Sequence, residues 1–193
     1  MSKNKSIYTM VECAIMLALS VVLSVIAPIK LPFGGSVTIF SQLPCVIASY
    51  RHGLKWGLAT SSLFGLISLL LGLDNYAYIA HTFVSVAIFV VCDYIGAFGV
   101  LGLGGIFRKV IKNQTLALAC GAALVSVLRY IFHVISGITI WKGYAEDMSV
   151  FAYSVTYNAT YMLPELIVTV IGAVAVGSIF KDLKKQNPLP AKK

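Results

Sequence analysis

Six long apolar runs dominate this sequence, and they exclude an ordinary soluble fold. Most of these runs approach the roughly 20 residues that a helix needs to cross a bilayer, and the second is short and follows Pro28, Pro32, Gly34 and Gly35. The chain is 59% hydrophobic and only 11% charged, whereas about a quarter of the residues in a soluble domain are charged. We therefore predict an all-α integral membrane protein with six transmembrane helices in one domain. The domain covers residues 1–193, with tails at 1–7 and 181–193, and its predicted spans are 8–27, 37–50, 54–73, 88–107, 115–137 and 149–180.

The positions of lysine and arginine predict how these spans are oriented. Twelve basic residues lie in the two tails and in the turns at 51–55 and 108–112. Only Lys30 and Lys142 lie in the turns on the opposite side. Because basic loops stay in the cytoplasm, both termini are predicted to be cytoplasmic. The net charge of +8 therefore reflects topology, since a nucleic-acid site would need its charges on one soluble face.

Asp93 is the most informative polar residue, because it lies inside the fourth predicted span. Counting back from Arg108 places it about 8 Å below the outer membrane edge, and residues 76–87 then form an outer loop or a short extra helix. A carboxylate in a span costs several kcal/mol unless it pairs, faces water or binds a cation. Two interpretations stay open: Asp93 holds a cationic ligand, or it forms an internal salt bridge with Arg129.

Arg129, His133 and Trp141 form a second polar group near the outer side of the membrane. Arg129 and His133 are four residues apart, so they share one face of the fifth span. Trp141 follows at its outer end. An aromatic ring there, like that of Tyr144, either anchors the chain at the interface or stacks on a flat or cationic ligand.

Tyr153 and Asn158 begin the sixth span at a similar depth. They lie five residues apart, about 140° from alignment on a regular helix. They therefore need an irregular first turn, or they flank one ligand from two sides. Asparagine in a span also commonly makes a hydrogen-bonded helix contact. Polar groups from three runs thus converge on the outer third of the membrane, and we predict a small-molecule site there.

Several other residues are interpreted as structural. Glu12 lies near the inner interface, and Glu165 lies deeper than the polar cluster, directly after Pro164. The four cysteines form no CxxC pair and are interpreted as small core residues. The sequence contains no GxxxxGKS/T, HExxH or GxSxG motif. We therefore predict no ATP-binding site, no metal, no cofactor and no enzymatic activity.

Five stretches of the chain carry a resemblance to a known family. They are GGSVT at 34–38, YRHG at 50–53, CDYIGAF at 92–98, RYIFHVISGITIW at 129–141 and AYSVTYNATYMLPE at 152–165. Together they resemble the thiamine-specific S-component of energy-coupling factor transporters. The resemblance implies a fold of six helices in the bacterial plasma membrane, with a vitamin bound near the outer face. It also implies dependence on a separate transmembrane coupling protein and two ATP-binding subunits.

The resemblance implies roles for individual residues. The family's acidic ligand matches Asp93, although some members have glutamate there. The other matched ligand positions are Tyr94, His133, Trp141, Tyr153 and Asn158. Further candidates are Arg129, Tyr78, His81 and the pair Gly34 and Gly35, where at least one member has an aromatic residue.

A second surface follows from the same resemblance. Ala14 and Ala18 lie one turn apart in the first span and match the AxxxA pattern with which the family contacts its coupling protein. Small residues let another helix approach closely in lipid. The alternative is that the two alanines pack the core of the chain itself.

Thiamine suits the predicted site chemically, because it joins a cationic ring to a flat aminopyrimidine. A neutral ring such as that of riboflavin would not need a buried carboxylate. Three alternatives stay open. The first is an S-component for another vitamin or purine-like ring, and the second is a stand-alone secondary transporter. The third is an intramembrane enzyme with Asp93 and His133 as acid and base.

Overall fold

The computed structural model describes residues 3–186, and helices account for most of this range. The α-helices are α1 (Lys3–Val25), α2 (Leu43–His52), α3 (Leu54–Leu71), α4 (Phe83–Ile88), α5 (Ala97–Gly99), α6 (Gln114–Thr139) and α7 (Val150–Gln186). Short 3-10 or π-helical segments occupy Pro32–Gly34, Leu73–Tyr78, Phe89–Gly96, Val100–Leu103, Ile106–Lys109 and Lys142–Tyr144. Helices α1 and α7 extend into the predicted tails, of which residues 1–2 and 187–193 lie outside the described part.

Within residues 3–186, five helical stretches are long and apolar enough to cross a membrane. This confirms the predicted all-helical membrane fold. The count of six spanning helices is not confirmed, because the short run predicted at 37–50 forms a helix only at its inner part, where α2 has ten residues, or about 15 Å of helix. The outer part of this crossing is irregular backbone, which a membrane protein tolerates where the backbone is buried in protein.

A small hairpin directly precedes the irregular outer part of that crossing. Strand β1 (Ile29–Lys30) pairs antiparallel with β2 (Ser36–Val37), and the 3-10 turn Pro32–Gly34 joins them. Proline at the start of the turn fixes φ and has no N–H to donate. Gly34 adopts φ 93°, a left-handed conformation that glycine takes at little cost. These residues explain why the chain turns back between β1 and β2.

The fourth span is one long crossing with changing helical geometry. It runs over Phe83–Lys109 and begins five residues before the predicted start at 88. The region 76–87 therefore divides between the end of the 3-10 segment Leu73–Tyr78 and the start of α4. Its middle, Phe89–Gly96, is π-helical. A widened turn of this kind inside a longer helix often marks a functional site.

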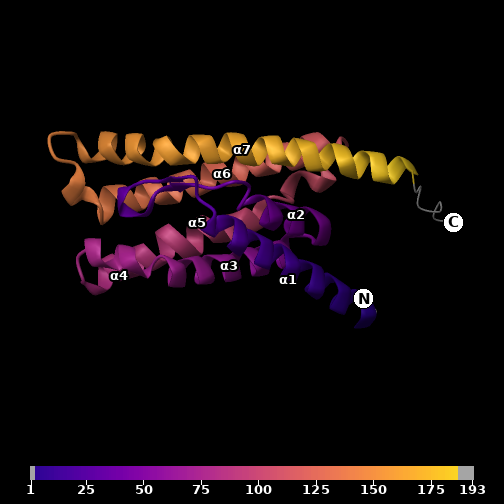
Figure 1. The fold of residues 1–193 in the computed structure, drawn as a ribbon, viewed down its shortest axis with the longest axis horizontal. Helices are drawn as coiled ribbons and strands as arrows, with labels where there is room; N and C mark the ends of the chain where they lie inside the picture. The colour runs from indigo at the N-terminus through magenta and orange to yellow at the C-terminus, as the bar shows by residue number, and fades with distance from the viewer. Residues whose placement is uncertain (1–2, 187–193) are drawn as a thin grey trace.

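Figure 1 shows how the spans are arranged. Helices α6 and α7 lie side by side along the long axis, and α3 and the stretch that contains α4 lie on the other side of the molecule. Helix α1 crosses obliquely at the end where α7 finishes, and α2 packs between the two layers. The opposite end holds α4 and the connection between α6 and α7. The start of α1 and the end of α7 thus lie at one end, as the basic residues predict for the cytoplasmic side.

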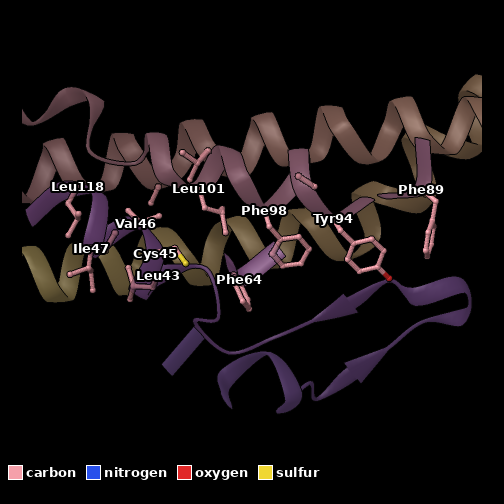
Figure 2. Packing of buried hydrophobic residues seen from close by; sticks show 14 of the residues in the cluster. Leu43, Cys45, Val46, Ile47, Phe64, Phe89, Tyr94, Phe98, Leu101 and Leu118 are labelled. Atoms are coloured by element: carbon pink, nitrogen blue, oxygen red, sulfur yellow. The ribbon is translucent and has the colours of Figure 1, made fainter. Parts of the chain in front are cut away.

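The hydrophobic core runs through the middle of this bundle (Figure 2). Val46, Phe64, Leu101 and Leu118 are fully buried and come from four different helical segments. Close backbone approach supports this packing, since a side chain at Gly102 would strike the backbone of Leu58. The core thereby holds the fourth span against α3 and α6.

The inner end is held by a partly buried acidic group on α1. Glu12 forms ion pairs with Arg51 and, at 3.0 Å, with His52, both at the end of α2. This gives Glu12 the structural role that its position near the inner interface suggests.

Candidate functional site

A cavity of about 670 Å³ lies toward the outer end of the bundle; we call it the outer cavity. Its walls come from the end of α1, the hairpin, the α3–α4 connection, the π-helical segment, α6 and α7. Most of the predicted site residues line it. These are Gly34, Gly35, Tyr78, Asp93, Tyr94, Arg129, His133, Trp141, Tyr153 and Asn158.

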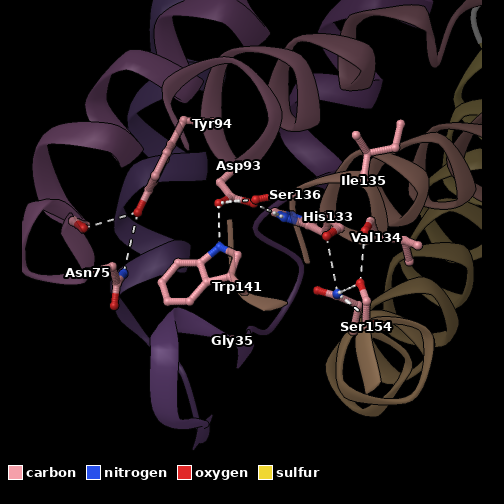
Figure 3. A network of polar contacts seen from close by, with 12 residues as sticks. Gly35, Asn75, Asp93, Tyr94, His133, Val134, Ile135, Ser136, Trp141 and Ser154 are labelled. Atoms are coloured by element: carbon pink, nitrogen blue, oxygen red, sulfur yellow. Dashed lines mark hydrogen bonds and ion pairs between the residues drawn. The ribbon is translucent and has the colours of Figure 1, made fainter. Parts of the chain in front are cut away.

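The carboxylate of Asp93 is held by three side chains of α6 and its outer end (Figure 3). Its Oδ1 lies 3.2 Å from Nδ1 of His133. Its Oδ2 accepts hydrogen bonds from the hydroxyl of Ser136 at 2.7 Å and from the indole N–H of Trp141 at 3.1 Å. Bonds to an ionised acceptor are roughly twice as strong as neutral ones. The carboxylate is thus stabilised and held in one orientation at the cavity wall.

The π-helical geometry brings Asp93 and its neighbour Tyr94 to the same cavity. Tyr94 is buried, and its hydroxyl donates to the carbonyl of Gly72 at 3.2 Å. The amide of Asn75 lies 3.5 Å from the same hydroxyl oxygen. Tyr94 therefore links the fourth span to the α3–α4 connection, and its ring forms part of the wall.

The predicted salt bridge between Asp93 and Arg129 is not formed, and this alternative was wrong. No ion pair within residues 3–186 joins them; the acidic group pairs with His133 instead. Arg129 lies one turn deeper than His133 on α6, about 6 Å along the axis. Its guanidinium lies 4.3 Å from the ring centroid of Phe98, a cation–π contact. Its side chain nevertheless lines the outer cavity.

Tyr153 and Asn158 lie on a continuous stretch of α7, so no irregular first turn is needed. Asn158 is buried, and its amide donates to the carbonyls of His133 at 3.3 Å and Ser154 at 2.8 Å. Its oxygen accepts from the hydroxyl of Tyr161 at 2.6 Å. The side chain therefore makes the helix contact that one interpretation favoured, while it also faces the cavity.

Two further tyrosines of the same helix belong to the site and were not predicted from the sequence. Tyr157 and Tyr161 follow Tyr153 at intervals of four residues, and all three line the outer cavity. The rings of Tyr153 and Tyr157 are stacked at 5.8 Å. The Tyr157 hydroxyl donates to the carbonyl of Pro32 and accepts from the N–H of Gly35 at 3.3 Å. Their spacing on one helical face was the signal that could have identified them.

The hairpin brings a further aromatic ring to the cavity. Phe33, at the tip, has its ring centroid 4.2 Å from Tyr144, 5.6 Å from Tyr78 and 6.1 Å from Trp141. Its backbone adopts φ 62°, which is rare for a residue other than glycine. The other candidate from this region, His81, does not line the cavity; it stacks on Tyr76 at 4.5 Å.

The arrangement suits a small, flat cation. An anchored carboxylate lies among the faces of indole and phenol rings, and both attract positive charge. Within the described residues, no group of three or more histidine, cysteine, aspartate or glutamate side chains could hold a metal ion. The site therefore has the parts for binding an organic cation.

Comparison with known proteins agrees with this geometry. A family model described as thiamine transporter protein (Thia_YuaJ) matches residues 10–185. The chain belongs to this family. The thiamine transporter ThiT of Bacillus subtilis (strain 168) is 34% identical over 183 residues, which cover 89% of this chain and 91% of that protein. The resemblance drawn from the motifs is thereby confirmed.

A solved structure of ThiT from Listeria monocytogenes has the same fold. It matches with a TM-score of 0.75 and 22% sequence identity, covering 93% of this chain and 98% of that one. Together with the five apolar spans, membership of the Thia_YuaJ family makes the chain a multi-pass protein of the bacterial plasma membrane.

The two alanines predicted as a coupling surface lie away from the outer cavity. Ala14 and Ala18 are both exposed on α1. The alternative that they pack the core of this chain was therefore wrong, because a core residue would be buried. This leaves a small-residue face of α1 open to the membrane, where another helix can approach it.

Proposed function

We propose that this member of the Thia_YuaJ family is the high-affinity thiamine-binding subunit of an energy-coupling factor transporter. Its role is to capture thiamine from outside the cell in the outer cavity. Separate ATP-binding subunits would power uptake through a transmembrane coupling protein. The observation that carries the proposal is the Asp93 carboxylate, fixed by His133, Ser136 and Trp141 in a wall of aromatic rings.

Each part of thiamine has a partner in this cavity. The positive charge of the thiazolium ring is matched by Asp93, since a carboxylate in a span is stabilised by a bound cation. Trp141 and the stacked Tyr153 and Tyr157 offer faces for the two flat rings. Hydrogen-bonding groups of Tyr94, His133 and Asn158 line the same cavity. Arg129, Tyr78, Gly34 and Gly35 complete the proposed binding wall.

The proposal assigns no catalysis to the chain. An intramembrane hydrolase would need a nucleophile activated by a base. Here the hydroxyl of Ser136 donates to Asp93, not to His133. The geometry therefore favours an orienting role for all three groups around one carboxylate.

The proposed partners follow from two features of the chain. The sequence has no phosphate-binding GxxxxGKS/T motif, so ATP hydrolysis must occur in other subunits. Ala14 and Ala18 form an exposed small-residue face on α1. We assign this face to contact with the coupling protein.

Titration calorimetry on the purified subunit tests the function. Thiamine should bind tightly at one molecule per chain, with no product detectable by mass spectrometry after long incubation. Riboflavin, a neutral ring, should not bind. Tight binding of another vitamin in place of thiamine would support a different S-component, and turnover of the ligand would support the enzyme.

A further inference from the structure

Glu165 lies below the outer cavity and has 1% of its surface exposed. No basic side chain within the described residues lies at ion-pair distance from it. Its partners are neutral donors from the chain segment between β2 and α2. Its Oε1 accepts two hydrogen bonds from Thr38, one from the backbone N–H and one, at 2.5 Å, from the side-chain hydroxyl. Its Oε2 accepts a hydrogen bond from the side-chain amide of Gln42 at 2.7 Å. An ionisable group inside a membrane is costly to keep and is a candidate for a function.

The segment that Glu165 holds, residues 38–42, has no helix or strand of its own. Phe40 in its middle adopts φ 63°, a conformation that costs free energy unless the surroundings fix it. The hydroxyl oxygens of Thr38 and Ser41 lie 2.5 Å apart. Because the Thr38 proton goes to the carboxylate, Ser41 is the donor in this pair. The carboxylate thus replaces the regular hydrogen bonds that the segment lacks.

The same segment forms part of the cavity wall. Thr38 and Ser41 line the outer cavity, whereas Glu165 lies behind them. Glu165 itself belongs to α7, the helix that carries Tyr153 and Tyr157. Glu165 follows Pro164, which lacks an N–H and loosens the helix locally. One buried side chain therefore connects two separate parts of the wall.

We propose that Glu165 is a positioning residue for the ligand site, an inference that rests on the proposed function. It fixes the wall segment 38–42 to α7. The hairpin and the face of α7 that carries Tyr153 and Tyr157 therefore keep a constant spacing. It acts through Thr38 and Gln42 and does not touch the ligand.

The hydrogen-bond pattern predicts which substitution is tolerated. Oε1 of Gln42 is buried and has no partner. In Glu165→Gln, the new amide oxygen can accept from Thr38. After rotation of the Gln42 amide, the new N–H group can donate to this free oxygen. Glu165→Leu has a similar size but offers no acceptor, and it leaves the donors of Thr38 and Gln42 buried and unpaired.

The test measures ligand dissociation and the fluorescence of Trp141 in a Trp56→Phe background. Trp56 is the other of the two tryptophans, so this background leaves Trp141 as the only source of tryptophan emission. The ring centroids of Trp141 and Phe33 of the hairpin lie 6.1 Å apart. In Glu165→Leu, thiamine should dissociate about tenfold faster, equivalent to about 1.4 kcal/mol. The emission of ligand-free Trp141 should also shift. In Glu165→Gln, the rate should stay within about threefold of the wild-type rate and the emission should not shift.

A matched control separates positioning from general weakening of α7. Thr169 is fully buried one turn further along α7, and its hydroxyl donates to the backbone carbonyl of Glu165 at 2.7 Å. Thr169→Val should leave both dissociation and emission unchanged. Three outcomes would overturn the proposal. The first is that Thr169→Val changes dissociation and emission as much as Glu165→Leu does, and the second is that Glu165→Leu behaves like the wild type. The third is that Glu165→Gln accelerates dissociation as much as Glu165→Leu does.

The test also covers a Glu165→Leu variant that does not fold and a wild-type protein that does not bind thiamine. If Glu165→Leu does not fold, Thr38→Val removes one donor alone and should accelerate dissociation about threefold; an unchanged rate would overturn the proposal. If the wild-type protein does not bind thiamine, the proposed function fails. The shift of Trp141 emission without ligand then still decides whether Glu165 positions the wall.

Discussion

The indole N–H of Trp141 donates a hydrogen bond to Oδ2 of Asp93 across 3.1 Å. This bond joins the outer end of α6 to the middle of the fourth span. It fixes the orientation of the indole ring and occupies one lone pair of the carboxylate. The charge and the aromatic face that we assign to thiamine binding are therefore arranged before the ligand arrives. Such preorganisation reduces the free-energy cost of ordering groups on binding.

Trp141 should contribute to affinity in two separable ways. Trp141→Phe keeps an aromatic face and removes the donor, whereas Trp141→Ala removes both. Stacking of a base-like ring contributes roughly 1–3 kcal/mol, so Trp141→Ala should weaken thiamine binding by about 5-fold to 150-fold. Trp141→Phe should lose less. Calorimetry measures both affinities.

Fluorescence provides an independent check on this residue. Thiamine should quench the tryptophan emission of the wild-type protein. Trp141→Ala should abolish most of the quench, and Trp56→Phe, near the inner end of α3, should retain it. The opposite pattern would show that the ligand site or the topology is wrong.

Gly137 should be required for the packing that positions the α7 residues. A Cβ atom there would lie 2.8 Å from Cβ of Ser154 and 3.2 Å from the amide nitrogen of Asn158. Gly137→Ala should therefore push α6 from α7, lower the melting temperature and weaken thiamine binding about tenfold or more, since overpacking costs about 1–3 kcal/mol. Gly143→Ala is the control, because open space surrounds Gly143. Equal behaviour of the two variants would contradict this account.

Ala14 and Ala18 should matter for transport and not for binding. Both lie exposed on α1, outside the outer cavity, so bulky side chains there can block a partner helix without disturbing the ligand. The double variant Ala14→Trp and Ala18→Trp should lose thiamine uptake and co-purification with the coupling protein. Its calorimetric affinity for thiamine should stay within about twofold of the wild-type value, since distant, independent sites rarely affect each other by more than 0.3–0.5 kcal/mol. Full uptake by the double variant would place the coupling surface elsewhere.

The sequence predicts the membrane fold well because hydropathy and basic turns act over whole spans. It also brings Asp93, His133 and Trp141 to a similar depth, since depth follows from counting residues along a helix. The run at 37–50 also predicts a short second crossing. The sequence could not predict that its helix begins only at Leu43, because the composition of residues 38–42 does not distinguish irregular backbone from helix.

Depth alone also could not identify the partner of Asp93. Opposite charge favoured Arg129, but the rotation of each helix decides which side chain reaches the carboxylate. A π-helical segment changes that rotation, and no local pattern in Phe89–Gly96 indicates it. His133 and Ser136 reach Asp93 instead, and Arg129 stacks on Phe98. Tyr157 and Tyr161 were predictable in principle, because their spacing from Tyr153 places them on one face.

The central claim is that the charge of Asp93 holds the charge of thiamine. Calorimetry tests it with wild-type protein and Asp93→Asn, each titrated with thiamine and with an uncharged analogue whose thiazolium nitrogen is replaced by carbon. Losing one partner of a buried charge pair costs about 2–5 kcal/mol, so the substitution should weaken thiamine binding at least about 30-fold. The variant should remain folded, and its loss for the uncharged analogue should be much smaller. Unchanged thiamine affinity in Asp93→Asn, or an equal loss for both ligands, would contradict the account.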